Sequence, residues 1–183
     1  MMRVFWTAVA GLGLASCSAQ PAANTGNGGE VSATPTAAAK AGTHPISGLE
    51  IIDVTVQSGQ MRHVFRSELA NTPETQAKGM MFRTEMGDDE GMLFPSDLPA
   101  PRSFWMKNTP LSLDIIFVGV DGRISNIGAN AVPYSLDSVL SVGPTIAVLE
   151  LRGGLAAELG ITAGDRVIWP GSPVNDTEGE AAQ

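Results

Sequence analysis

The segment FWMKNTPLSLDIIF, residues 104–117, sets polar side chains between aromatic and aliphatic ones. Lys107 offers a cation and Asn108 an amide, while Phe104 and Trp105 offer an aromatic wall. Small-molecule sites combine mostly apolar walls with a few polar groups of this kind. The same residues also fit a simple turn, in which Asn108 bonds the local backbone and Lys107 lays its stem over Trp105. Both interpretations stay open.

Glu150 is a second group that could do chemistry. In TIAVLEL, residues 145–151, it shares one face of a predicted strand with Val148, and leucines occupy the other face. A carboxylate between two apolar faces is expected to be partly buried, and burial without a partner raises its pKa. Lys107 or Arg83 could supply a compensating cation, either as a structural ion pair or as part of a site.

Two further charged residues are candidates. Asp114 lies near the start of a predicted strand, where a carboxylate often bonds backbone amides. Arg83 follows the GMM turn and is either a salt-bridge partner or an anion hook. The two histidines, His44 in the predicted linker and His63, have no companions at metal-ligand spacing. We therefore expect no metal and no cofactor.

Short strands and two small helices must position these groups. Thr72-Pro73-Glu74 predicts the start of a helix that reaches about Met81 or Phe82. Many short strands with so little helix predict an α+β fold, a compact, β-rich, barrel-like curled sheet with two short helices. Strands are expected at 49–57, 63–70, 91–94 (ended by Pro95), 113–119, 124–130, 145–151 and 165–169, and the second helix at 153–160.

The first residues are typical of an exported, lipid-anchored protein. Arg3 precedes the apolar run 4–15, which is shorter than the about 20 residues of a membrane span and matches a signal peptide. Leu14-Ala15-Ser16-Cys17 resembles the bacterial lipobox, which implies removal of residues 1–16 and lipidation of Cys17. We expect attachment to a membrane of the bacterial cell envelope, with the periplasmic side of the outer membrane as one candidate.

Composition divides the remaining chain. Residues 17–47 are rich in Ala, Thr, Gly, Asn and Pro, so we expect the lipidated Cys17 to be followed by a disordered linker that reaches on the order of 30 Å. One domain is expected at 48–171 and a flexible tail at 172–183. A net charge of −8 argues against nucleic acid as a partner, because phosphate binding needs clustered Lys and Arg. We expect a monomer.

Four motifs follow one another along the predicted domain. They are GMMFR (79–83), GMLF (91–94), FWMKNTPLSLDIIF (104–117) and VLELRGGLAAELGITAGDRV (148–167). Together they resemble the DUF192 family, also called UPF0127, although Met80 stands where leucine is commoner and RGG departs slightly from the usual pattern. The resemblance implies a compact, β-rich, barrel-like fold in bacterial and archaeal proteins that are often exported. It implies no reaction.

These features favour a membrane-tethered accessory module that binds a small ligand or a partner's segment beside FWMKN. One alternative is a small hydrolase or transferase in which Glu150 is the acid or base and Lys107 steadies negative charge. Another is a structural envelope protein without a ligand. Glu150 and Lys107 alone are a thin catalytic set, so we favour binding. We expect Lys107 and Asn108 at the rim of a concave feature walled by Trp105, with Glu150 nearby.

Overall fold

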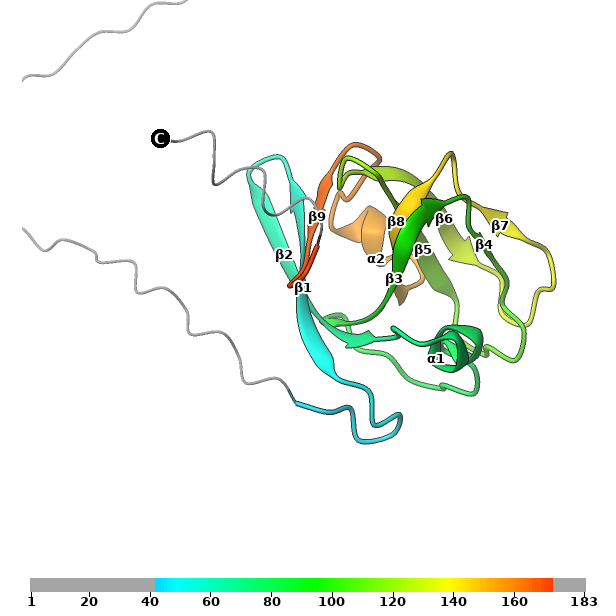
Figure 1. Cartoon of the computed structure of the whole chain (residues 1–183). Helices are drawn as coiled ribbons and strands as arrows, with labels where there is room; N and C mark the ends of the chain where they lie inside the picture. Colours follow the sequence, from blue (N-terminus) through cyan, green and yellow to red (C-terminus); the bar gives the residue numbers. More distant parts are fainter. Residues whose placement is uncertain (1–41, 173–183) are drawn as a thin grey trace, which may run out of the picture. The chain divides into compact units, whose positions relative to one another are not determined.

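The computed structural model describes residues 42–172, which fold into a β-rich domain with two short helices (Figure 1). This confirms the expected element types. The elements are β1 (Ile51–Ser58), β2 (Met61–Leu69), α1 (Pro73–Lys78), β3 (Glu90–Ala100), β4 (Ser103–Phe104), β5 (Leu113–Gly119), β6 (Ile124–Ala131), β7 (Val139–Leu140), β8 (Thr145–Arg152), α2 (Leu155–Glu158) and β9 (Arg166–Ile168).

Seven strands form one mixed sheet in the order β6-β5-β8-β3-β2-β1-β9, and β4 pairs with β7 apart from it. The pairing of β2 with β3 is parallel and the other pairs are antiparallel. The expected barrel-like curled sheet does not close into a barrel in this part of the chain. The two edges approach through an isolated bridge between Arg123 and Arg166, and no ladder joins β6 to β9. A strongly curled, open sheet is therefore the observed architecture.

Helix α1 begins as the sequence predicts. The Thr72 hydroxyl accepts a hydrogen bond from the Thr75 amide at 3.3 Å, and Pro73 occupies the first turn. The helix ends at Lys78, however, and not at Met81 or Phe82. The backbone leaves helical geometry at Gly79 (φ 47°), and Phe82 also has a positive φ of 64°. The GMMFR segment is therefore a loop.

Strand β3 differs from the prediction, because it does not end at Pro95 but continues to Ala100. Its pairing with β2 stops at Leu93, so Pro95 lies where β3 has a neighbour on one side only. Proline is tolerated at such edge positions. The register with β8 then shifts between Pro95 and Ala100.

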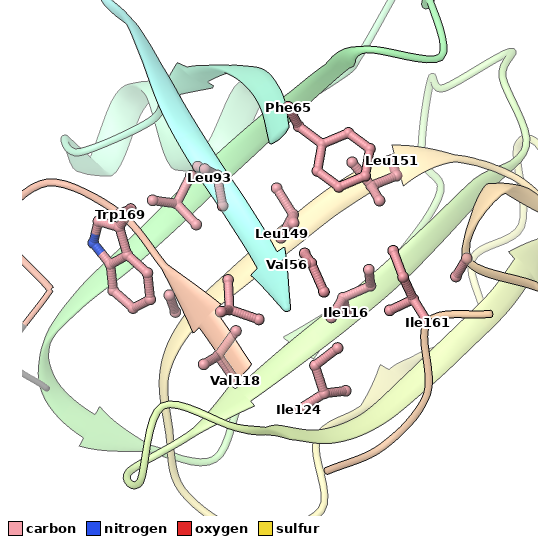
Figure 2. Close-up of a cluster of buried hydrophobic side chains, with 14 of the residues drawn as sticks. Val56, Phe65, Leu93, Ile116, Val118, Ile124, Leu149, Leu151, Ile161 and Trp169 are labelled. Atoms are coloured by element: carbon pink, nitrogen blue, oxygen red, sulfur yellow. The ribbon is translucent and has the colours of Figure 1, made fainter. Parts of the chain in front are cut away.

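Buried apolar side chains gather in two clusters. The larger one lies inside the curl, where Leu93, Ile116, Leu149 and Leu151 meet residues from β1, β2 and β9 (Figure 2). The second lies on the other face and contains Met92, Phe94, Met106, Ile115, Phe117 and Val148. Alternation along β5 and β8 explains the division, because successive side chains point to opposite faces. Glu150, one residue from Leu149 and Leu151, therefore faces the second cluster.

The folded part begins before residue 48. Thr43 forms an antiparallel bridge with Glu50, and the Ile51 amide donates to the Gly42 carbonyl at 2.8 Å. Residues 42–47, expected as linker, thus belong to the fold. The predicted signal segment, Cys17, the rest of the linker and the tail from 173 lie outside the described residues. Within 42–172 no helix has the length and apolar character needed to cross a membrane.

Candidate functional site

Glu150 is the buried acid of the site. It lies on β8 between β3 and β5, paired with Met92 and Ile115, and only 4 % of its surface is exposed. Its Oε2 atom has no hydrogen-bond partner within residues 42–172. Burial among apolar groups raises the pKa of Glu150 to about 8. The burial that the sequence predicted is observed, but without the compensating cation, so the carboxyl is mostly protonated at neutral pH and can donate a hydrogen bond.

The segment 104–109 covers this region from the side of β4. The Phe104 ring packs edge-on against Phe94 and Phe117, with ring centroids 5.1 and 6.1 Å apart. Trp105 is half exposed, and the Lys107 Nζ lies 5.0 Å from the centroid of its ring. The ammonium of Lys107 thus lies in a cation–π position over Trp105, where the turn interpretation had placed the aliphatic stem. Its ammonium does not pair with Glu150.

Asn108 forms the turn that ends this segment. Its φ of 55° is left-handed, a conformation that asparagine tolerates better than most residues. Its carbonyl accepts a hydrogen bond from the Phe82 amide at 2.8 Å, and the Thr109 carbonyl accepts one from the Tyr134 amide at 3.1 Å. Asn108 therefore ties the GMMFR loop to the FWMKNT loop through its backbone.

These elements enclose a small hollow of about 40 Å³. We name it the Glu150 hollow. It brings together Trp105, Lys107 and Glu150, as the sequence analysis expected, but Asn108, which was also expected at the rim, does not line it. Its other lining residues are Gln76, Ala77, Lys78, Gly79, Met80, Met81, Phe94, Phe104 and Thr109.

A larger, mainly apolar groove lies on the other side of the GMMFR loop. Its volume is about 290 Å³, and it shares Lys78, Gly79 and Met81 with the Glu150 hollow. Ile46 and Phe82 line it and are largely exposed. A short loop therefore lies between the Glu150 hollow and the apolar groove.

Arg83 pairs with an acid that the sequence analysis did not single out. Its Nη2 donates to both carboxylate oxygens of Glu68, at 2.7 and 2.6 Å, and both side chains are largely buried. The Ser47 hydroxyl also donates to Glu68, and His44 lies 3.3 Å from the guanidinium. The salt-bridge interpretation of Arg83 is the observed one, and Arg83 does not compensate Glu150.

Sequence periodicity could not reveal Glu68. On β2 it shares a face with Val64 and Arg66, both of which are exposed. Glu68 becomes buried because the 42–49 segment, which carries His44 and Ser47, folds over the end of that face. That segment reads as linker by composition, so it gives no signal. The cluster also borders a cavity of about 220 Å³ that Arg66 and Glu85 line.

Asp114 lies away from the Glu150 hollow. It is fully buried, and its carboxylate accepts hydrogen bonds from the amides of Asn130, Gly154 and Ala156 at 2.8, 3.0 and 2.9 Å. It thus joins β6 to the start of α2, as the backbone-amide interpretation predicted. Within the described part of the chain, no three His, Cys, Asp or Glu side chains gather as a metal site would require.

Comparisons with known proteins place this geometry in a family. The model of the DUF192 family, described as "Uncharacterized ACR, COG1430", matches residues 54–169. A crystal structure of a protein of unknown function from Novosphingobium aromaticivorans DSM 12444 is 59 % identical, with 72 % of this chain and 94 % of that one covered and a TM-score of 0.71.

A second solved structure, from Sinorhizobium meliloti 1021, is 38 % identical. It covers 68 % of this chain and 97 % of its own, with a TM-score of 0.66, and that protein carries a proposed role as a transcription regulator. No curated protein matches.

Proposed function

Because the chain belongs to the DUF192 family, which brings no assigned activity, we propose a function from the geometry itself: a ligand-binding module, tethered to a bacterial membrane through Cys17. The ligand enters the Glu150 hollow. Trp105 and Lys107 meet it at the rim, and the Glu150 carboxyl meets it at the base.

The observation that carries this proposal is the unpartnered Oε2 of Glu150. Buried polar atoms are nearly always hydrogen-bonded, and leaving one unsatisfied costs about 1–3 kcal/mol. Here the unsatisfied atom belongs to a residue that lines a hollow with an aromatic wall. A bound polar group would supply the missing hydrogen bond. A purely structural role gives no reason to keep a carboxyl there.

Catalysis is the second candidate, since a carboxyl with a pKa of about 8 can give or take a proton near neutral pH. Hydrolysis would also need a water molecule that Glu150 activates, and transfer to the protein would need a nucleophilic side chain. The hydroxyl that lines the hollow, that of Thr109, donates instead to the Lys107 carbonyl at 3.2 Å. Binding therefore remains the better supported function.

Ligand binding is tested on the protein purified from its native envelope. Native mass spectrometry of wild type should show a co-purifying small molecule, and Trp105→Ala should lose it. Leu140→Ala, a change at another exposed apolar residue on β7, should keep it. Equal occupancy in wild type and Trp105→Ala, or an empty wild type, contradicts the proposal.

The membrane tether has a test of its own. Cells supplied with labelled palmitate should incorporate the label into wild type and not into Cys17→Ala, because the thiol is the expected attachment point. Wild type should partition with membranes and the variant with the soluble fraction, since two or more acyl chains hold a protein stably on a bilayer. Membrane attachment of Cys17→Ala would contradict the anchor while leaving the binding proposal intact.

A further inference from the structure

Charge around the Glu150 hollow is positive. Lys78 from the end of α1 and Lys107 from the covering loop both line it, and Glu150 is the one acid among its lining residues. Neither lysine forms an ion pair with another residue of the described domain. The guanidinium of Arg102 lies over the Phe104 ring, with its Cζ atom 5.6 Å from the ring centroid. The neighbouring strands β3 and β5 present Met92, Phe94 and Ile115 to Glu150 and add no charge.

We propose that the Glu150 hollow takes the carboxylate head of a small organic acid whose apolar body stacks on Trp105. The inference rests on the proposed binding function and names its ligand class. Two ammonium groups attract the anion, and the Glu150 O–H donates to it. Such a charge-assisted hydrogen bond is shorter and stronger than a neutral one.

The Glu150 carboxyl at the bottom of the hollow can bind an anion only while the carboxyl keeps its proton. Burial, which raises the pKa of Glu150 to about 8, provides that condition at neutral pH. An apolar site that holds a carboxylic acid neutral turns it into a hydrogen-bond donor. An ammonium head would instead meet the like charges of Lys78 and Lys107, which line the hollow, and like charges repel.

The size of the hollow limits what enters it. At about 40 Å³ the hollow is several times smaller than the apolar groove of about 290 Å³, and smaller than the roughly 300–1,000 Å³ of most small-molecule pockets. A planar carboxylate head matches this space, but a whole ligand does not. The body must therefore lie outside, against the half-exposed indole of Trp105.

An isosteric series tests the ligand class on the full-length chain in mild detergent. Calorimetric titration with benzoate, benzamide and benzylammonium compares an anionic, a neutral and a cationic head on the same ring. Benzoate should bind most tightly at pH 6. At pH 9 its affinity should be about tenfold lower, because a group with a pKa of about 8 keeps its proton in roughly a tenth of the molecules.

Two variants and a control locate the effect. Glu150→Gln keeps a donor without a titratable proton, so it should bind benzoate within a few-fold of wild type at pH 6 and lose most of the weakening at pH 9. Lys107→Met should weaken benzoate binding about three- to tenfold at both pH values. Arg62→Met, at an exposed cation on β2, should change nothing.

The outcomes separate this inference from the proposed function. Preference for benzylammonium, with affinity rising toward pH 9, overturns the ligand class and keeps the hollow as a site. Benzoate binding that ignores both pH and Lys107→Met also overturns the class. If no probe binds although a ligand co-purifies through Trp105, the class is again overturned. An empty native protein that binds none of the three overturns both.

Discussion

At Glu150 the fold holds a proton that the unfolded chain releases. Its pKa is about 8 in the native state, against 4.5 for the ordinary group. Between these values the native state binds one more proton than the unfolded state. This contribution to the free energy of unfolding is therefore complete below pH 4.5 and falls as pH rises. By pH 8 the loss is on the order of 5 kcal/mol, and above pH 8 the contribution levels off.

Glu150→Gln should remove that slope, because the amide has nearly the same shape and does not titrate. Urea unfolding at pH 5, 7 and 9 measures it. The stability of wild type minus that of the variant should shrink by several kcal/mol across this range. A difference that stays constant with pH would show that the carboxyl is not desolvated in the native protein.

Substitutions in the turn at Lys107 and Asn108 distinguish a structural motif from a binding site. Asn108→Ala should cost about 1 kcal/mol, because alanine tolerates the left-handed backbone poorly, whereas Asn108→Gly should cost little. Lys107→Ala should stay within about 0.5 kcal/mol of wild type, since the residue is exposed. A larger loss at Lys107, measured by thermal and urea unfolding, would make the cation architectural.

At the scale of elements, the Glu68–Arg83 pair joins β2 to the GMMFR loop. Arg83→Ala leaves a buried carboxylate without its main partner and should cost about 3–5 kcal/mol. Arg66→Ala removes an exposed arginine from β2, the strand that carries Glu68, and is the control; it should cost far less. Adding Glu68→Gln to Arg83→Ala should recover part of the loss in urea unfolding. Strict additivity of the two changes would mean that the pair does not interact in solution.

Elements whose own residues carry the pattern could be predicted. The alternation in β8 placed Leu149 and Glu150 on opposite faces, and the position of Asp114 near a strand start predicted its bonds to backbone amides. The continuation of β3 beyond Pro95 could not be predicted, because it depends on where the neighbouring strand β2 ends. The last residue of β2 pairs with Leu93 of β3. The parallel pairing of β2 with β3 could not be predicted either, because it is a property of distant segments and not of local sequence.

At the scale of the whole molecule, the parts of the site that depend on local sequence could be predicted, and those that depend on contacts between distant segments could not. The three groups of the Glu150 hollow were predictable together, since two of them lie in one motif and the third is an acid in an apolar strand. The loop that separates the hollow from the apolar groove was not. Its shape depends on hydrogen bonds from Phe82 to Asn108 and on Arg83 reaching Glu68, contacts between residues far apart in sequence.

The domain boundary gives a prediction at this scale. A chain that starts at Gly42 should unfold at the same temperature as the full-length protein, because the contacts of the described fold begin there. A chain that starts at Gly48 loses His44 and Ser47 and exposes Glu68, so its melting temperature should fall by several degrees. Equal melting temperatures for the two truncations would place the boundary at residue 48.

The hairpin at residues 42–50 is also where the fold meets the chain that leads toward Cys17. A force on the chain before residue 42 would enter the domain there and act on Glu68 through Ser47 and His44. The guanidinium that steadies Glu68 belongs to Arg83, the last residue of the loop beside the Glu150 hollow. A displacement of this hairpin and the filling of the hollow would therefore both act on the GMMFR loop.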